Sequence, residues 1–251
     1  MIKELIERIR QGNQTTLFPK AEPGLPAIFR GAPALDQSKC PPECSMCVDA
    51  CPTDAIHLDG KLRIDLGRCV FCPACVETCQ PGAIKFTNGH RLAGSSRQCL
   101  VVDEKALAPV QPLSEDLLGI FRRSLKIRQV SAGGCNACEA EISALSNVVF
   151  DMARFGVQVV ASPRHADALM VTGPVTKNMR LALEKTIAAT PEPKIVIAVG
   201  TCAISGGIYR EREEQLGGAD SVAPVALYIP GCPPHPVTIL DGILRMLDRL
   251  D

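Results

Sequence analysis

From about residue 114 onward, short apolar runs alternate with longer stretches of helical spacing. The runs are rich in Val and Ile, which favours strands, and the stretches between them place apolar residues three or four positions apart, which favours helices. Strands alternating with helices predict a parallel sheet covered on both faces, a flavodoxin-like doubly wound α/β layer. The strands are predicted at 126–130, 157–161, 167–173, 194–200 and 225–230, and the helices at 138–146, 175–189 and 234–249.

The first half of the chain contains an internal repeat, because residues 44–60 recur 28 positions later at 72–88. A Pro- and Gly-rich arm precedes the repeat, and the polar stretch 87–98 that follows it is typical of a linker. The two halves of the repeat are therefore predicted to be one structural unit used twice. The matching residues are Cys44, Cys47, Cys51, Ala55 and Ile56 in the first copy and Cys72, Cys75, Cys79, Ala83 and Ile84 in the second.

The composition limits the kinds of partner and ligand that the chain is expected to bind. Lys+Arg and Asp+Glu balance at 27 each, which does not favour nucleic acid or an anionic membrane surface, and no Trp with 2 Tyr makes a base-stacking surface improbable. The 13 cysteines are too unevenly placed for a disulfide scaffold. No apolar segment has the length of a membrane span, and the start has no signal-type run, so we expect a cytoplasmic chain with reduced thiols that bind metal.

The repeat carries two cysteine runs, "CPPECSMCVDACP" and "CVFCPACVETCQP". Thiolates are soft ligands, and a C-x-x-C-x-x-C loop can wrap around an iron–sulfur cube. The runs resemble a bacterial two-cluster ferredoxin, which implies that the last cysteine of each run crosses over to the other cluster. A pair of zinc knuckles is the alternative, although zinc sites usually have longer spacers. The implied ligand sets are Cys40, Cys44, Cys47 with Cys79, and Cys69, Cys72, Cys75 with Cys51.

One spacing departs from the ferredoxin pattern, because three residues rather than two separate Cys40 from Cys44. The extra residue can bulge at the two prolines between them. If Cys40 cannot reach its cluster, we expect a three-iron form or recruitment of Cys99. Otherwise Cys99 is expected to be a small buried residue or an unused thiol.

The second half contains four more cysteines, in loops that follow predicted strands. Because the carboxyl ends of parallel strands meet at one sheet edge, the four thiols can converge there on a third 4Fe–4S cluster. The turn "SAGG" could alternatively hold a phosphate, and a C-x-x-C pair could be a redox dithiol. The Walker pattern is absent, and a dithiol leaves two of the four cysteines unexplained. The four are Cys135, Cys138, Cys202 and Cys232.

The same half resembles a known family, the small subunit of membrane-associated, energy-converting nickel–iron hydrogenases and its homologue in respiratory Complex I. The resemblance covers about residues 126–245 and is carried by "GCNACEAE", "ARFGVQVVASPRHADALMVTGPVT", "VGTCAISGG" and "YIPGCPPHP". Cys135 and Cys138 are separated by two residues, which is similar to the hydrogenase branch. The first half resembles the ferredoxin subunit of the same complexes, including "FRGAP" at 29–33.

These resemblances divide the chain into four segments. An N-terminal helix and docking arm (1–38) precedes an α+β two-cluster ferredoxin domain (39–90). A linker and connecting helix (91–125) leads to the small-subunit-like domain with one cluster (126–251). Two subunits that are usually separate would thus be fused.

The resemblance implies an electron-relay subunit that holds three 4Fe–4S clusters and performs no substrate chemistry alone. Its partners would be a large hydrogenase-type subunit and other soluble and membrane subunits, on the cytoplasmic face of the inner membrane. One alternative is a Complex I-like quinone oxidoreductase subunit. Another is a free-standing multi-cluster ferredoxin or redox sensor.

Three further features have alternative interpretations. By resemblance, Glu139 and Glu141 could relay protons, with Glu139 the stronger candidate. The alternative is that both acids only stabilise the first turn of a helix through its dipole. His235 could tune a cluster by hydrogen bonding, although an exposed loop position is favoured. The apolar stripe at Ile2, Leu5, Ile6 and Ile9 predicts a helix that packs on a partner subunit, with a membrane surface as the alternative.

Overall fold

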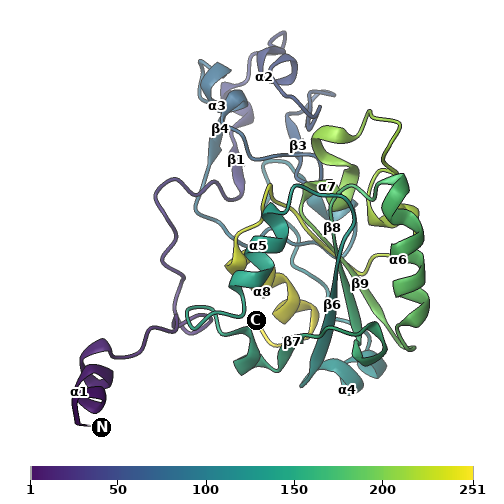
Figure 1. Ribbon diagram of the computed structural model, residues 1–251. Coiled ribbons are helices and arrows are strands. Elements are labelled where there is room, and N and C mark those ends of the chain that lie inside the picture. Colours follow the sequence, from purple (N-terminus) through teal and green to yellow (C-terminus); the bar gives the residue numbers. More distant parts are fainter. Residues whose placement is uncertain (1, 251) are drawn as a thin grey trace.

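The computed structural model describes residues 2–250, and a five-stranded parallel sheet forms its larger part (Figure 1). The strand order is β10-β9-β8-β6-β7, so in chain order the second strand lies at one edge and the first lies beside it. This is the flavodoxin-like order, and it confirms the predicted doubly wound α/β class. The strands are β6 (Leu125–Ser131), β7 (Val157–Val159), β8 (Ala168–Thr172), β9 (Ile195–Val199) and β10 (Leu227–Ile229).

Helices cover both faces of this sheet, α6 on one side and α5 and α8 on the other (Figure 1). The two inner strands β8 and β9 are buried along their whole length, as expected where both faces are covered. The helices of this part are α4 (Glu115–Phe121), α5 (Ala137–Ala144), α6 (Lys177–Ala189), α7 (Thr201–Ser205) and α8 (Pro236–Met246). Helix α7 is too short for its periodicity to be visible in the sequence.

The cysteine-rich part is built from short elements. Its helices are α2 (Met46–Asp49) and α3 (Ala74–Thr78), one in each copy of the repeat. Strand β1 pairs antiparallel with β4, and β3 lies between β2 and β5. These α+β features fit a ferredoxin-like part. The strands are β1 (Pro33–Leu35), β2 (Ile56–His57), β3 (Arg63–Asp65), β4 (Ile84–Phe86) and β5 (Val101–Val102).

The two parts share one hydrophobic core. Buried Ile64 and Leu100 of the cysteine-rich part belong to the same cluster as Leu169 and Val171 of strand β8. Residues 87–98, the expected linker, are packed as well: Gly94 exchanges two backbone hydrogen bonds of 2.9 Å with Tyr228 beside the sheet. The cysteine-rich part is therefore fixed against the sheet, while the domain boundaries themselves stay a prediction.

Helix α1 (Ile2–Gln11) projects away from the rest of the molecule (Figure 1). Its apolar stripe is uncovered, with Ile2 76% and Ile9 74% exposed. The arm behind it is attached to the body, because Arg154 donates hydrogen bonds of 2.9 and 2.6 Å to the carbonyl oxygens of Thr16 and Phe18. Within residues 2–250, no helix has the length and apolar character needed to span a bilayer.

Candidate iron–sulfur sites

The first group of cysteines combines three residues of the first run with one of the second. Cys40, Cys44, Cys47 and Cys79 line a common small cavity. Burial raises the pKa of Cys47 to about 11, and the neighbouring Cys40 and Cys79 thiols contribute to the rise. The structure thus brings together the thiols that the ferredoxin resemblance implies for one cluster, including Cys40 with its unusual spacing.

The second group has the reciprocal composition. Burial raises the pKa of Cys69 to about 12, and Cys75, Cys51 and Cys72 all contribute to the rise. Cys51 comes from the first run and the other three from the second. Each run therefore contributes three thiols to one group and one thiol to the other.

The repeat is also visible in how the crossing cysteines are held. The backbone N–H of Ala55 donates to Cys51 Sγ over 3.3 Å, and the N–H of Ala83 donates to Cys79 Sγ over the same distance of 3.3 Å. A third such bond of 3.3 Å joins the N–H of Phe71 to Cys69 Sγ. Backbone N–H groups aimed at sulfur stabilise a thiolate, and hydrogen bonds to sulfur tune the potential of a bound cluster.

The third group forms at the carboxyl ends of strands β6, β9 and β10. Cys135 lies in the loop after β6 and Cys138 in helix α5, whereas Cys202 lies in α7 after β9 and Cys232 follows β10. Burial raises the pKa of Cys202 to about 11, and Cys232 and Cys135 contribute to the rise. Burial, Cys202, Glu139, Cys232 and Cys135 raise the pKa of Cys138, in that order. The four cysteines therefore converge.

Glycines permit this convergence. A Cβ atom on Gly200 would lie 2.5 Å from Cys138 Sγ, so only glycine lets strand β9 end this close to the thiol. Gly173, after β8, has φ +80° and faces the backbone of Gly134, which precedes Cys135. The β8 loop thus supports the loop that carries Cys135.

We expect Gly173→Ala to destabilise the protein and to disturb the third group. The left-handed backbone costs a non-glycine residue about 1–3 kcal/mol, and the added methyl would overlap the backbone of Gly134. Gly60→Ala is the matched control, because Gly60 has φ +75° and no atom lies within 4 Å of the place that its added methyl would occupy. Thermal unfolding and iron content should change more for Gly173→Ala, and equal changes in the two variants would contradict the expectation.

The chemistry of these groups fits iron–sulfur binding. Burial and neighbouring thiols raise the pKa of Cys47 in the first group, Cys75 in the second and Cys202 in the third, so several thiolates can lie together only if bound cations compensate their charge. All-thiolate sets are the usual ligands of iron–sulfur clusters. Among residues 2–250, no three His, Cys, Asp or Glu side chains form a group suited to a single metal ion.

The three groups adjoin one another in a row. Cys47 of the first group contributes to the raised pKa of Cys75 in the second. Cys72 of the second group contributes in the same way to the raised pKa of Cys232 in the third. Cys135 and Cys232 are exposed, so the third group faces outward.

Glu139 lies beside the third group. Its Oε1 accepts hydrogen bonds from Ser131 Oγ at 2.6 Å and Thr172 Oγ1 at 2.7 Å. Burial raises its pKa, but these hydrogen bonds together outweigh burial and the net pKa is lowered. For Glu141, burial raises the pKa. Two acids only two residues apart thus have environments that shift their pKa values in opposite directions.

His235 is half-buried, so the favoured interpretation of an exposed loop position is wrong. Its Nδ1 accepts a hydrogen bond of 3.2 Å from the backbone N–H of Val237 at the start of α8. Its ring makes edge contacts with Phe29 and Phe150, at centroid distances of 5.6 and 5.9 Å. A helix-capping role and two aromatic neighbours explain the burial.

Cys99 belongs to none of the three groups. Its Sγ lies 3.2 Å from Ser96 Oγ.

Two hydroxyls that the sequence did not predict, those of Thr201 and Ser205, reach from α7 to backbone carbonyls in the loop of the second group. The sequence feature that could have pointed to Thr201 was its position next to Cys202.

Comparison with known proteins identifies the family of the second half of the chain. The profile of the family described as "NADH ubiquinone oxidoreductase, 20 Kd subunit" matches residues 135–246. Formate hydrogenlyase subunit 7 of Escherichia coli is 43% identical over 163 residues, which are 65% of this chain and 62% of that protein. The chain thus spans less than two thirds of that relative.

Two further relatives come from different types of complex. A probable membrane-bound hydrogenase subunit of Pyrococcus furiosus is 43% identical over 51% of this chain and 77% of its own length. An NADH-quinone oxidoreductase subunit of Bacteroides thetaiotaomicron is 44% identical over 44% of this chain and 57% of its own length. The chain belongs to the NADH ubiquinone oxidoreductase 20 kDa subunit family. This membership and the grouped cysteines point to iron–sulfur cluster binding.

Proposed function

We propose that this chain is an electron-relay subunit in which all cysteines except Cys99 hold three 4Fe–4S clusters. The observation that carries the proposal is the row of three four-thiol groups, linked through the Cys47–Cys75 and Cys72–Cys232 neighbours. Such clusters accept and release single electrons. Passing electrons through one polypeptide requires a row of adjacent sites.

The ligand assignment follows the grouping. The crossing residues Cys79 and Cys51 complete the first and second sites. The chain's residues supply thiolates, hydrogen bonds to sulfur, and a rigid sheet edge that fixes the third site. The sets are Cys40, Cys44, Cys47 and Cys79; Cys51, Cys69, Cys72 and Cys75; and Cys135, Cys138, Cys202 and Cys232.

Iron and acid-labile sulfide analysis of anaerobically purified chain tests this assignment. Three cube-type clusters correspond to about twelve of each per chain, and two to about eight. A value near eight that is unaffected by changes to the four cysteines of the second half would overturn the proposal. Low-temperature EPR of the reduced chain, with three interacting centres, is the accompanying expectation.

The exposed third group is the proposed exit to a partner. Electrons would enter at the first two sites and leave near Cys135 and Cys232, both of which are exposed, into a large hydrogenase-type subunit. The names of two relatives, a formate hydrogenlyase subunit and a probable membrane-bound hydrogenase subunit, support this partner and a place in a membrane-associated complex. Its peripheral position on the cytoplasmic face is part of the proposal. Delivery to quinone is the alternative, since one relative is a subunit of an NADH-quinone oxidoreductase.

Activity of the purified complex separates these candidates. Hydrogen uptake or evolution that depends on the chain supports the hydrogenase role, whereas chain-dependent quinone reduction supports the second. A chain that purifies as a stable monomer without a large subunit would favour a free-standing ferredoxin or redox sensor.

Glu139 is the proposed proton-relay residue at the exit. Glu139→Gln should slow proton-coupled turnover of the assembled complex, because an amide cannot carry the proton, while it keeps the hydrogen bonds to Ser131 and Thr172 available. Cluster EPR spectra should be unchanged. Glu141→Gln is the comparison variant on the same helix, and unchanged turnover in Glu139→Gln would remove Glu139 from the proton path.

A further inference from the structure

Thr201 is the buried hydroxyl at the junction of the second and third cysteine groups. It begins helix α7 and immediately precedes Cys202, and only 1% of its surface is exposed. Its Oγ1 lies 2.8 Å from the carbonyl oxygen of Cys69 and 3.1 Å from that of Gly231. The backbone N–H of Thr201 already donates to Gly231 over 2.9 Å, which leaves the hydroxyl proton for Cys69.

This position lets Thr201 contact residues of two sites at once. Cys69 belongs to the second group, Cys202 is the next residue in the chain, and Gly231 precedes Cys232. A single hydroxyl therefore connects the backbone of one proposed cluster ligand to the loops of two others.

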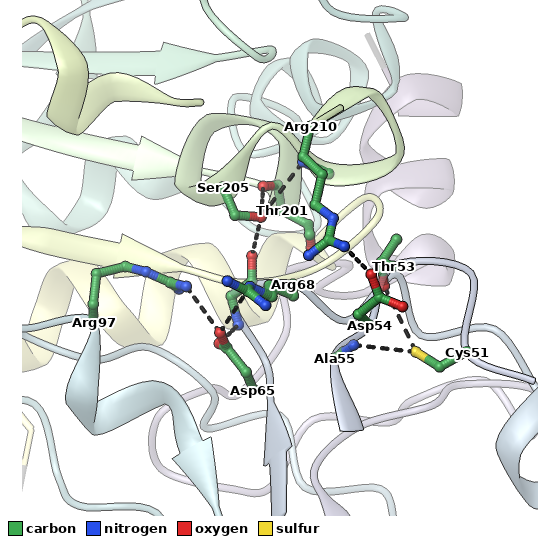
Figure 2. Close-up of polar contacts among 12 residues, drawn as sticks. Cys51, Thr53, Asp54, Ala55, Asp65, Arg68, Arg97, Thr201, Ser205 and Arg210 are labelled. Carbon is green, nitrogen blue, oxygen red and sulfur yellow. Dashed lines mark hydrogen bonds and ion pairs between the residues drawn. The ribbon is translucent and has the colours of Figure 1, made fainter. Parts of the chain in front are cut away.

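Neighbouring contacts restrain the same junction. Ser205 Oγ, one helical turn after Thr201, donates to the carbonyl oxygen of Gly67 at 2.7 Å. Arg210, farther along the same segment, forms an ion pair with Asp54 (Figure 2). The segment from Thr201 to Arg210 is thus attached to the cysteine-rich part at three points.

The loop that receives these contacts is itself fixed. Asp65 Oδ1 accepts a hydrogen bond of 2.8 Å from the backbone N–H of Gly67, and its Oδ2 lies 2.9 Å from Arg97 Nη2 (Figure 2). The second group is therefore presented to helix α7 by a stiff loop, so a hydroxyl bond across the junction can determine the spacing.

We infer that Thr201 is a positioning residue that fixes the gap between the second and third sites and thereby sets the rate of electron transfer between them. The inference rests on the proposed relay function. With clusters bound, an electron crossing the junction would oxidise the cluster held at the Cys69 site and reduce the one held at the Cys202 site, with no proton or bond exchanged. Electron tunnelling decays steeply with distance, so a small widening of the gap slows the transfer.

Three variants of the full chain test the role. Thr201→Val keeps the shape but removes the donor and leaves a buried carbonyl unpaired. Thr201→Ser retains the hydroxyl. Thr190→Val is the matched control, because Thr190 is similarly buried and donates a 2.9 Å hydrogen bond to Thr186 at the end of helix α6, away from the cysteines.

The readouts are iron content, the potential of each centre, the dipolar coupling between the reduced second and third centres, and their equilibration rate. Freeze-quench EPR after mixing with reduced methyl viologen gives that rate. In Thr201→Val we expect weaker coupling and severalfold slower equilibration, with iron content and potentials unchanged. Thr201→Ser and Thr190→Val should match the unaltered chain.

Unchanged coupling and rate in Thr201→Val would overturn the inference, as would equal slowing in Thr201→Ser. If Thr201→Val fails to retain the third centre, Ser205→Ala replaces it, and an unchanged rate in that variant is the overturning result. Failure of the relay proposal looks different: the unaltered chain would then lack a third centre, or that centre would take no electron from the second.

Discussion

Cys202→Ala should remove one complete centre from the chain and leave the other two in place. Cys202 contributes to one group only, and the other cysteines of that group raise its pKa through their proximity, after the larger effect of burial. Loss of one of four ligands should lower iron from about twelve to about eight atoms per chain. Iron analysis and reduced-state EPR measure the loss.

The matched control is Cys99→Ala. Cys99 contacts Ser96 and belongs to no group, so all three centres should remain. Retention of full iron in Cys202→Ala would show that the four converging thiols do not act as one ligand set. Loss of iron in Cys99→Ala would instead restore Cys99 as a recruited ligand.

The second large effect concerns the crossing cysteines. Cys79→Ala should affect the same centre as Cys40→Ala, although Cys79 lies in the other run, because these two thiols line one cavity. The double variant should therefore lose no more iron than one centre holds, about four atoms per chain. Cys79→Ala combined with Cys75→Ala should affect two centres.

Oxidised-state EPR distinguishes full loss of a centre from its conversion to a three-iron form. Cys51→Ala is the mirror control and should be non-additive with Cys69→Ala, which shares its group. Additive losses in Cys79→Ala with Cys40→Ala would mean that each run holds its own cluster and that no crossing occurs.

The sequence was sufficient for the features that depend on period and spacing. The β-branched runs at 167–173 and 194–200 predicted strands β8 and β9, because a buried parallel strand is apolar along its whole length. The alternation of these runs with helices predicted the flavodoxin-like order. The positions of Cys202 and Cys232 directly after strands predicted that they would meet at one sheet edge.

Other features leave no periodic signal. The pairing of Gly94 with Tyr228 joins residues far apart in the chain through backbone atoms alone, so residues 87–98 looked like an exposed linker. The Thr201 hydroxyl finds Cys69 only after the two parts have packed together. Burial of His235 likewise depends on aromatic rings that come from distant segments. Side-chain partners of this kind are determined by tertiary packing.

Because the cysteine-rich part and the sheet share one core, dilution should not separate them. Two separate subunits exchange electrons only while they are associated, so their throughput falls as concentration drops below the dissociation constant. In this chain the proposed donor and acceptor sites are covalently tethered and packed together, which would make the encounter intramolecular. The rate of transfer per molecule between these sites should therefore be first order and independent of protein concentration.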